Sequence, residues 1–206
     1  MLGTDSLEYD ILERAVARIG HLPAEAMSCE IGLREGGGSK YMLDTLFNTN
    51  QHSRTHIAID PYGNIEYETA ENQTTRHDYT NQMRNKCMRE LYFYASMHLY
   101  NAINVLVFIL EDTEFFNRYG DGVPVYAEYK SLLTKYAVVH FDGPHAAIPL
   151  KQEFDFFFER SLDGSVFVFD DIGNYDHDLF EKDVLFPNKL ELLEKGTRKA
   201  SYLVKK

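Results

Sequence analysis

The sequence predicts a single α/β domain whose sheet is mainly parallel with one antiparallel edge. Three observations indicate this fold class. Apolar strands alternate with helical patterns, the two last strands form a hairpin, and 206 residues with 44% apolar side chains suffice for one full core but would be cramped as two. We therefore expect one domain over residues 1–206.

Charge and cysteine content narrow the function classes. Asp and Glu number 32 against 21 Lys and Arg, a net charge of −11, so broad attraction to nucleic-acid phosphate is not expected. A metal cation or a neutral small substrate suits this balance better. Cys29 and Cys87 suggest no disulfide framework, and no apolar run approaches the roughly 20 residues of a membrane span. We expect a cytoplasmic protein that binds neither nucleic acid nor membrane; a homo-oligomer stays open.

The first element is an amphipathic helix over 6–19. Its apolar residues recur at helical spacing, Asp5 and Glu8 form a capping pair, and Gly20 follows the last periodic residue. A short apolar strand at 27–31 comes next.

A glycine-rich turn, 32–38, links that strand to a second helical pattern over 41–46. A second strand at 56–59 is closed by Asp60-Pro61, where the chain must turn because the residue before proline avoids the helical region. The order of strand, glycine turn and helix is typical of a nucleotide-binding α/β unit.

The stretch at about 66–104 is expected to be a helical insertion. Its polar start, with residues 72–75, indicates a loop, and apolar residues from Met83 to Leu99 indicate a long helix.

The remaining chain continues the alternation, with elements expected in this order: strand 105–110, helix 126–136, strand 137–141, helix 148–162, strand 166–169, and a hairpin of 189–194 with 199–204 around Gly196.

The ends of all five leading strands are acidic. Ligands of open α/β sheets bind beyond the carboxyl ends of the strands, so this edge indicates a polar ligand. The residues concerned are Glu30, Asp60, Glu111 with Asp112, Asp142, and Asp170 with Asp171.

The glycine run at 36–38 lets the backbone approach a ligand before a helix N-terminus. By itself it could equally be a flexible turn. Asp60 lies about twenty residues further on at the next strand end, the position of an acid that binds ribose hydroxyls. Together the two features favour a nucleoside site.

These residues carry a resemblance. The segment Glu30-Ile31-Gly32-Leu33-Arg34-Glu35-Gly36-Gly37-Gly38-Ser39, with Asp60, Asp112 and Asp142-Gly143-Pro144-His145, resembles class I S-adenosylmethionine-dependent methyltransferases. It is most similar to small-molecule O-methyltransferases with an E-x-G-x-x-x-G-G-S loop and an I-D-G-x-H strand end, although the loop here has one glycine more. The resemblance covers nearly the whole chain and implies a Rossmann-like, seven-stranded sheet.

The resemblance also implies roles for single residues. Asp60 would hold the ribose of S-adenosylmethionine, Asp112 would reach the adenine amine, and Asp142 would border both cofactor and metal. The residues expected around the methionine part are Glu30, Gly32, Gly36, Gly37, Gly38 and Ser39.

Asp142, Asp170 and Asp171 close two strands that should be neighbours, so their carboxylates should converge and could hold Mg²⁺ or another hard divalent cation. The spacing is similar to that of metal-dependent catechol and sugar O-methyltransferases, and the acidic pair resembles the sugar type. The simpler alternative is that the pair caps the following helix.

His145 lies where the family pattern implies a general base beside the metal; the simpler alternative is a loop histidine. His177 could border the site, whereas His140, within a strand, is expected to be structural.

The sequence thus favours metal-assisted O-methylation of a small molecule or sugar hydroxyl. A catalytically inactive nucleotide-binding or scaffold domain is the alternative. A Rossmann oxidoreductase is disfavoured because the loop lacks a closely spaced G-x-G-x-x-G.

Overall fold

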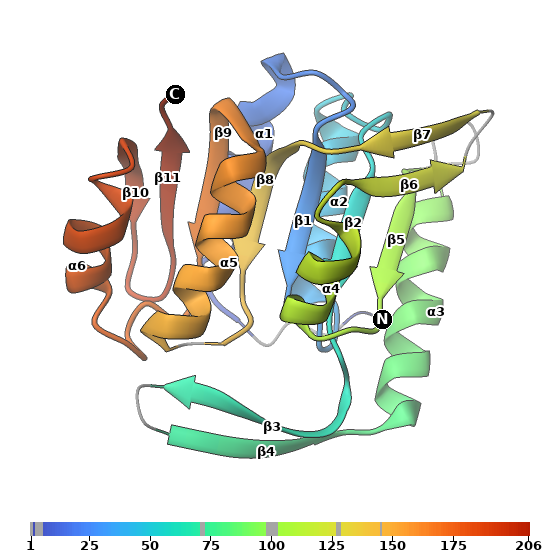
Figure 1. The fold of residues 1–206 in the computed structure, drawn as a ribbon. Coiled ribbons are helices and arrows are strands. Elements are labelled where there is room, and N and C mark those ends of the chain that lie inside the picture. Colours follow the sequence, from blue (N-terminus) through green and yellow to red (C-terminus); the bar gives the residue numbers. More distant parts are fainter. Residues whose placement is uncertain (1, 3–5, 71–72, 98–102, 127–128, 145) are drawn as a thin grey trace.

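A seven-stranded sheet forms the centre of the molecule (Figure 1). The computed structural model describes residues 2, 6–70, 73–97, 103–126, 129–144 and 146–206. The strand order is β10-β11-β9-β8-β1-β2-β5, and β11 runs in the opposite direction to the other six strands of this sheet. This confirms the expected mainly parallel sheet with an antiparallel C-terminal hairpin strand. The sheet strands are β1 (Met27–Ile31), β2 (His56–Ile59), β5 (Val105–Phe108), β8 (Tyr136–Phe141), β9 (Ser161–Phe169), β10 (Leu190–Lys195) and β11 (Ala200–Val204).

Helices cover both faces of the sheet, as Figure 1 shows. One face carries α1 (Tyr9–Arg18), α2 (Gly37–Asn48) and α3 (Asn81–Ser96); the other carries α4 (Asp112–Tyr119), α5 (Ala147–Arg160) and α6 (His177–Phe180). Short irregular helices follow α1 (Ile19–His21) and α6 (Glu181–Leu185). Alternate residues of the strands feed two separate apolar cores, one against each helical layer.

The start of α1 corrects the predicted capping pair. Asp5 lies outside the described residues. Glu8 is the N-cap residue at φ 58°, without a side-chain cap. Its carboxylate instead accepts hydrogen bonds from the backbone of Thr197, Arg198 and Lys199 at 2.8–2.9 Å. The helix therefore begins where its first residues meet the turn between β10 and β11.

The expected helical insertion at about 66–104 is only partly helical. It begins with an antiparallel hairpin of β3 (Gly63–Ala70) and β4 (Gln73–Tyr79), where the sequence predicted a loop. α3 follows, with Thr80 accepting a hydrogen bond from Met83 N at 3.2 Å. A polar hairpin lacks the apolar alternation on which strand prediction depends, so periodicity could not distinguish it from a loop. The hairpin lies across the carboxyl ends of the parallel strands (Figure 1).

The predicted helix at 126–136 is wrong. The helix between β5 and β8 is α4, which Glu111 and Glu114 begin as a capping box. The later segment forms an antiparallel pair, β6 (Val123–Tyr126) and β7 (Lys130–Leu133). Val123 and Val125 are β-branched and buried, which favours a strand more than the helical spacing of Tyr126, Tyr129, Leu133 and Tyr136 favours a helix. No helix in the described part of the chain is long and apolar enough to cross a membrane.

Candidate functional site

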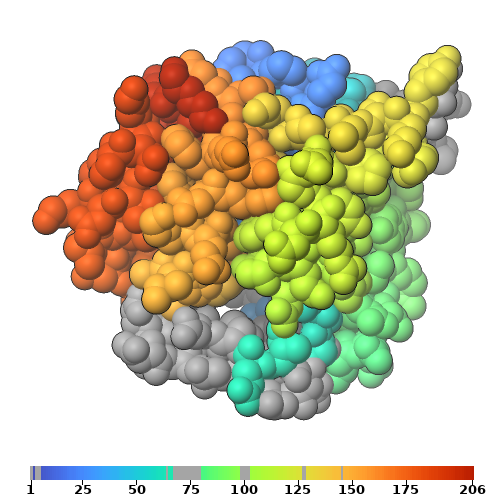
Figure 2. Space-filling model, in the orientation of Figure 1, coloured from blue at the N-terminus to red at the C-terminus, as the bar shows by residue number. Residues whose placement is uncertain are grey.

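A cavity of about 570 Å³ opens at the carboxyl ends of the central strands. Figure 2 shows the surface hollowed beneath α4 and α5, next to the start of β3. The residues that line it are Glu30, Ile31, Gly32, Leu33, Arg34, Gly37, Gly38, Ile59, Asp60, Pro61, Tyr62, Ile65, Glu66, Glu111, Asp112, Thr113, Asp142, Gly143, Pro144, Ile148, Pro149, Gln152, Asp171, Asn174 and Arg198. Predicted residues from β1, β2, α4 and β8 thus meet at one place.

The glycine turn after β1 packs too closely for any side chain at two positions. Gly32 has φ +84°, and a Cβ there would lie 1.9 Å from the carbonyl oxygen of Asp142. A Cβ on Gly38 would lie 1.9 Å from Glu30 Oε1. Only glycine satisfies both demands, so the turn forms a backbone cradle at the cavity wall.

Glu30 is fixed by a buried hydrogen-bond chain beneath this cradle. Its Oε2 accepts a hydrogen bond from Ser39 Oγ, and Oε1 lies 3.1 Å from His140 Nδ1. Ser39 Oγ also lies 2.9 Å from His56 Nε2, and burial lowers the pKa of His56 to about 3. A neutral His56 and a buried Ser39 therefore hold the Glu30 carboxylate at the cavity.

Two residues predicted to bind the cofactor are not at the cavity. Ser39 is fully buried behind Glu30, so it positions that carboxylate. Gly36 is the N-cap residue of α2 at φ 83°, and a Cβ there would meet Leu2 at 2.8 Å. Gly37 and Gly38, the two glycines that follow Gly36 in the predicted set, do line the cavity.

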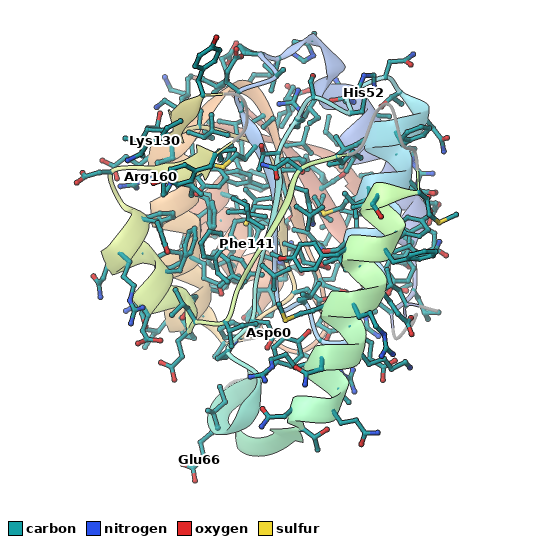
Figure 3. All side chains as sticks on the ribbon, turned by 90° about the vertical axis from the view of Figure 1, so that its right-hand side faces the viewer. His52, Asp60, Glu66, Lys130, Phe141 and Arg160 are labelled. Atoms are coloured by element: carbon teal, nitrogen blue, oxygen red, sulfur yellow. The ribbon has the colours of Figure 1, made fainter. Side chains whose placement is uncertain are left out.

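Asp60 closes β2 at the lower edge of the sheet in Figure 3, above the β3–β4 hairpin. Its oxygens accept hydrogen bonds from the backbone of Arg34 at 2.8 Å and Tyr62 at 2.7 Å. Burial raises its pKa to about 6, although these bonds oppose the rise. The Glu66 side chain, by contrast, points away from the body of the molecule (Figure 3).

Asp112 lines the cavity from the first turn of α4, and a second carboxyl group lies behind it. Glu153 on α5 is fully buried, and neither of its oxygens has a donor among the residues that the structure describes. Burial first, and then the charge of Asp112, raises the pKa of Glu153 well above its ordinary value. Burial beside Asp112 thus favours the neutral form of Glu153. Sequence reasoning missed it, although a lone Glu between the apolar positions Leu150 and Phe154 was a signal.

The predicted metal ligands converge only in part. Phe141 and Phe169, the last residues of β8 and β9, stack with ring centroids 4.6 Å apart, which places Asp142 and Asp170 side by side. The Asp170 carboxylate, however, binds Lys199 Nζ at 2.5 Å and Arg198 Nε at 3.0 Å.

The charges of the acidic pair are therefore balanced by side chains of the protein. Burial alone would raise the pKa of Asp170, but His140 and Lys199 outweigh it and lower that pKa. Asp171 lies 2.7 Å from Arg198 Nε and lines the cavity. This arrangement does not fit the predicted magnesium site, because the carboxylates meant for the ion already bind two cations.

A different group offers three ligand atoms within 4.8 Å of one another among the described residues: Glu30, His140 and Asp142. It shares only Asp142 with the predicted set. Burial, Asp170 and Glu30 raise the pKa of Asp142 well above its ordinary value. Because Glu30 already accepts from Ser39 and bonds His140, this group is better described as part of the buried chain.

Of the three histidines named in the sequence analysis, the structure describes two. His145, the predicted base, lies outside the described residues. His140 is buried in β8, as expected of a structural residue. His177 does not border the cavity: it is buried between the hydroxyls of Tyr175 at 2.8 Å and Tyr202 at 2.7 Å, and burial lowers its pKa to about 4.

Sequence reasoning also missed the cavity residues Arg34, Tyr62, Gln152, Asn174 and Arg198. For Arg198 a signal existed. A basic pair directly before the final strand must face the acidic pair after β9 if the two strands are antiparallel neighbours.

Comparison with known proteins agrees with this architecture. No family model and no curated protein matches the sequence. CalS11, a calicheamicin methyltransferase, aligns with a TM-score of 0.66 and 16% identity over 95% of this chain and 76% of its own. The O-methyltransferase NovP aligns at 0.63 and 14% over 96% and 79%. TomG, an O-methyltransferase from Streptomyces achromogenes solved with S-adenosylmethionine, aligns at 0.57 and 14% over 100% and 82%. The chain therefore has the Rossmann-like fold of the class I methyltransferases, as its motifs predicted.

Proposed function

We propose that this protein is an S-adenosylmethionine-dependent methyltransferase that acts on a hydroxyl group of a small molecule. The observation that supports this most is a single cavity lined by the glycine cradle, Asp60 and Asp112. These are the residues to which the motifs assign the methionine, ribose and adenine parts of the cofactor.

The charge of the cavity supports a cationic cofactor. Apart from Glu66, whose side chain points away, six acidic residues and two arginines line it: Glu30, Asp60, Glu111, Asp112, Asp142 and Asp171, with Arg34 and Arg198. A wall of this sign attracts a sulfonium and an ammonium group, and it disfavours the phosphates of NAD or ATP.

The chain's own residues would bind and orient the reactants. When bound, the cofactor supplies an electrophilic methyl group on a sulfonium sulfur. Asp60 would accept hydrogen bonds from ribose hydroxyls, and Asp112 one from the adenine amine. Pro144, Ile148 and Pro149 line the cavity and would place apolar surface beside the reacting groups. His145 remains the predicted base.

The part of the cavity lined by Gln152, Asn174 and Arg198, here called the acceptor side, suits a polyhydroxylated methyl acceptor. These side chains provide hydrogen-bond donors and acceptors for hydroxyl groups. CalS11 is described as a TDP-rhamnose 3′-O-methyltransferase, which supports testing sugars first. Magnesium has no part in this proposal, since Lys199 and Arg198 bind the carboxylates predicted to hold it.

Calorimetry and thermal melting with S-adenosylhomocysteine, NAD and ATP test the proposal. At about 100 times its dissociation constant, S-adenosylhomocysteine should stabilise the fold by about 2.7 kcal/mol, or about 5–10 °C for a chain of this size. Asp60→Ala should reduce this shift, whereas Asp121→Ala, at an exposed position, should not.

S-adenosylhomocysteine formation should then be measured on a panel of sugars and catechols. Cofactor binding without turnover on any acceptor would favour the scaffold alternative. Binding of NAD or ATP but not of S-adenosylhomocysteine would refute the proposal.

A further inference from the structure

An acidic pair and a basic pair face each other where β9 ends and β11 begins. The antiparallel register of these strands, continued beyond its last pair, sets Asp170 opposite Lys199 and Asp171 opposite Arg198. The bond from Ile172 N to Arg198 O, at 3.1 Å, shows that the pairing does continue. The strand topology itself therefore brings two positive charges to two negative ones.

The hydrogen-bonding capacity of Asp170 is filled. Its Oδ1 accepts from Arg198 Nε at 3.0 Å and from Asp171 N at 2.7 Å. Its Oδ2 accepts from Ser6 Oγ at 2.8 Å and from Lys199 Nζ at 2.5 Å. An ionised carboxylate has about four acceptor positions, so a metal ion could coordinate Asp170 only by displacing one of these donors.

The Lys199 ammonium is held in place by burial. Its side chain has 0% exposure, and Nζ also lies 2.5 Å from Ser6 Oγ and 5.1 Å from the Tyr9 ring. A buried ammonium requires a paired anion, and Asp170 is the anion in contact with it. Arg198 is less buried, at 31% side-chain exposure, and reaches the cavity itself.

We propose that Lys199 and Arg198 are resident cations that take the place of a divalent metal ion at Asp170 and Asp171. Their two fixed charges match that of a divalent ion. Arg198 then presents hydrogen-bond donors to the acceptor side of the cavity, without acting as a Lewis acid. The consequence that cofactor binding and turnover need no metal rests on the proposed function. The replacement of the metal charge by Lys199 and Arg198 does not depend on that function.

Calorimetric titration of Mg²⁺ and Mn²⁺ into the full chain tests this directly. The wild type should show no saturable binding up to about 5 mM, whereas Lys199→Met should bind one ion at about 10⁻⁴–10⁻³ M, the range of weak oxygen-ligand sites. Lys195→Met is the matched control, because it removes a lysine paired with Asp178 and Glu181; it should not bind the ion. Asp171→Asn added to Lys199→Met should abolish the new site.

Saturable metal binding by the wild type that Asp171→Asn removes would overturn the proposal, as would a folded Lys199→Met chain that binds no ion. If Lys199→Met does not fold, Arg198→Met serves instead. Removing this half-buried guanidinium frees one oxygen of Asp170 and one of Asp171, so the variant should also bind the metal ion. A folded Arg198→Met chain that binds no ion overturns the proposal. These readouts need no methyl transfer, so failure of the proposed function leaves them intact.

Discussion

The contact between the glycine turn and the end of β8 can be tested with three Gly→Ala substitutions. Gly32 combines a positive φ of +84° with a backbone contact, since its Cβ would lie 1.9 Å from the Asp142 carbonyl oxygen. Gly63 has nearly the same φ, +80°, but no described atom within 4 Å of its Cβ position. Gly173 has neither the positive φ nor a close neighbour in the described structure. The set separates backbone strain from lack of space.

The magnitudes follow from this geometry. Alanine in the left-handed region costs about 1–2 kcal/mol, which is the full effect expected at Gly63. At Gly32 the turn and β8 must also separate by about 1.4 Å to restore an ordinary C···O contact of about 3.3 Å, and overpacking adds about 1–3 kcal/mol. The total at Gly32 is about 2–5 kcal/mol. Gly173→Ala should stay within about 0.5 kcal/mol of the wild type.

Urea unfolding at constant m-value measures these differences. Thermal melting should give the same order, with Gly32→Ala lower by about 4–20 °C. If Gly32→Ala and Gly63→Ala destabilise equally, the turn does not pack against the Asp142 backbone, and the account of the cradle is wrong.

Three further predictions concern carboxyl groups. Because Asp60 has a pKa of about 6 and should bind ribose as a carboxylate, S-adenosylhomocysteine affinity should fall by up to about tenfold per pH unit below 6; calorimetry on Asp60→Asn should show no such slope. Glu153 has a raised pKa in the folded state, so its contribution to the free energy of unfolding is complete below the unfolded pKa and is lost as pH rises. In urea unfolding, the stability of Glu153→Gln should rise relative to the wild type between pH 5 and pH 8 by up to about 1.4 kcal/mol per pH unit. The same pH dependence of stability in both proteins would contradict this. Burial would raise the pKa of Glu8, but hydrogen bonds from Thr197 and the neighbouring backbone outweigh it and lower this pKa to about 2. Glu8→Gln should lower the free energy of unfolding by about 1 kcal/mol at pH 7 after solvent screening, and this difference should disappear as pH falls from 4.5 toward 2. Glu13→Gln, on α1, should show neither effect.

Most of the sheet was predictable because its strands carry strong apolar signals. The strand at 27–31 and the strand at 56–59 have the predicted bounds, since both are buried on both faces and closed by clear turns. The failures lie where that signal is weak. The β3–β4 hairpin is polar, and the segment from Tyr126 to Tyr136 has apolar residues at a spacing that also suits a helix.

The candidate site was predictable as an edge of the sheet but not as a set of contacts. Asp60 and Asp112 line the cavity as expected, because a strand end fixes their place. The contacts of Ser39 with His56 and of Asp170 with Lys199 could not be predicted, because His56 lies in β2 and Lys199 directly precedes β11, and a motif does not specify the lateral order of these strands. The identity of the cation at Asp170 depends on pairing between β9 and β11, which becomes visible only in three dimensions.

The contact of Glu8 with residues 197–199 has a consequence for folding kinetics. It joins residues 189–191 positions apart, whereas β1 and β2 pair across only 28 positions. Contacts with such long sequence separation close late, because the loop entropy must be overcome before the contact forms. We therefore expect the central strands to gain hydrogen-exchange protection before the backbone amides of Thr197 and Lys199 during refolding. The cation beside Asp170 would then be among the last parts of the cavity edge to reach its native position.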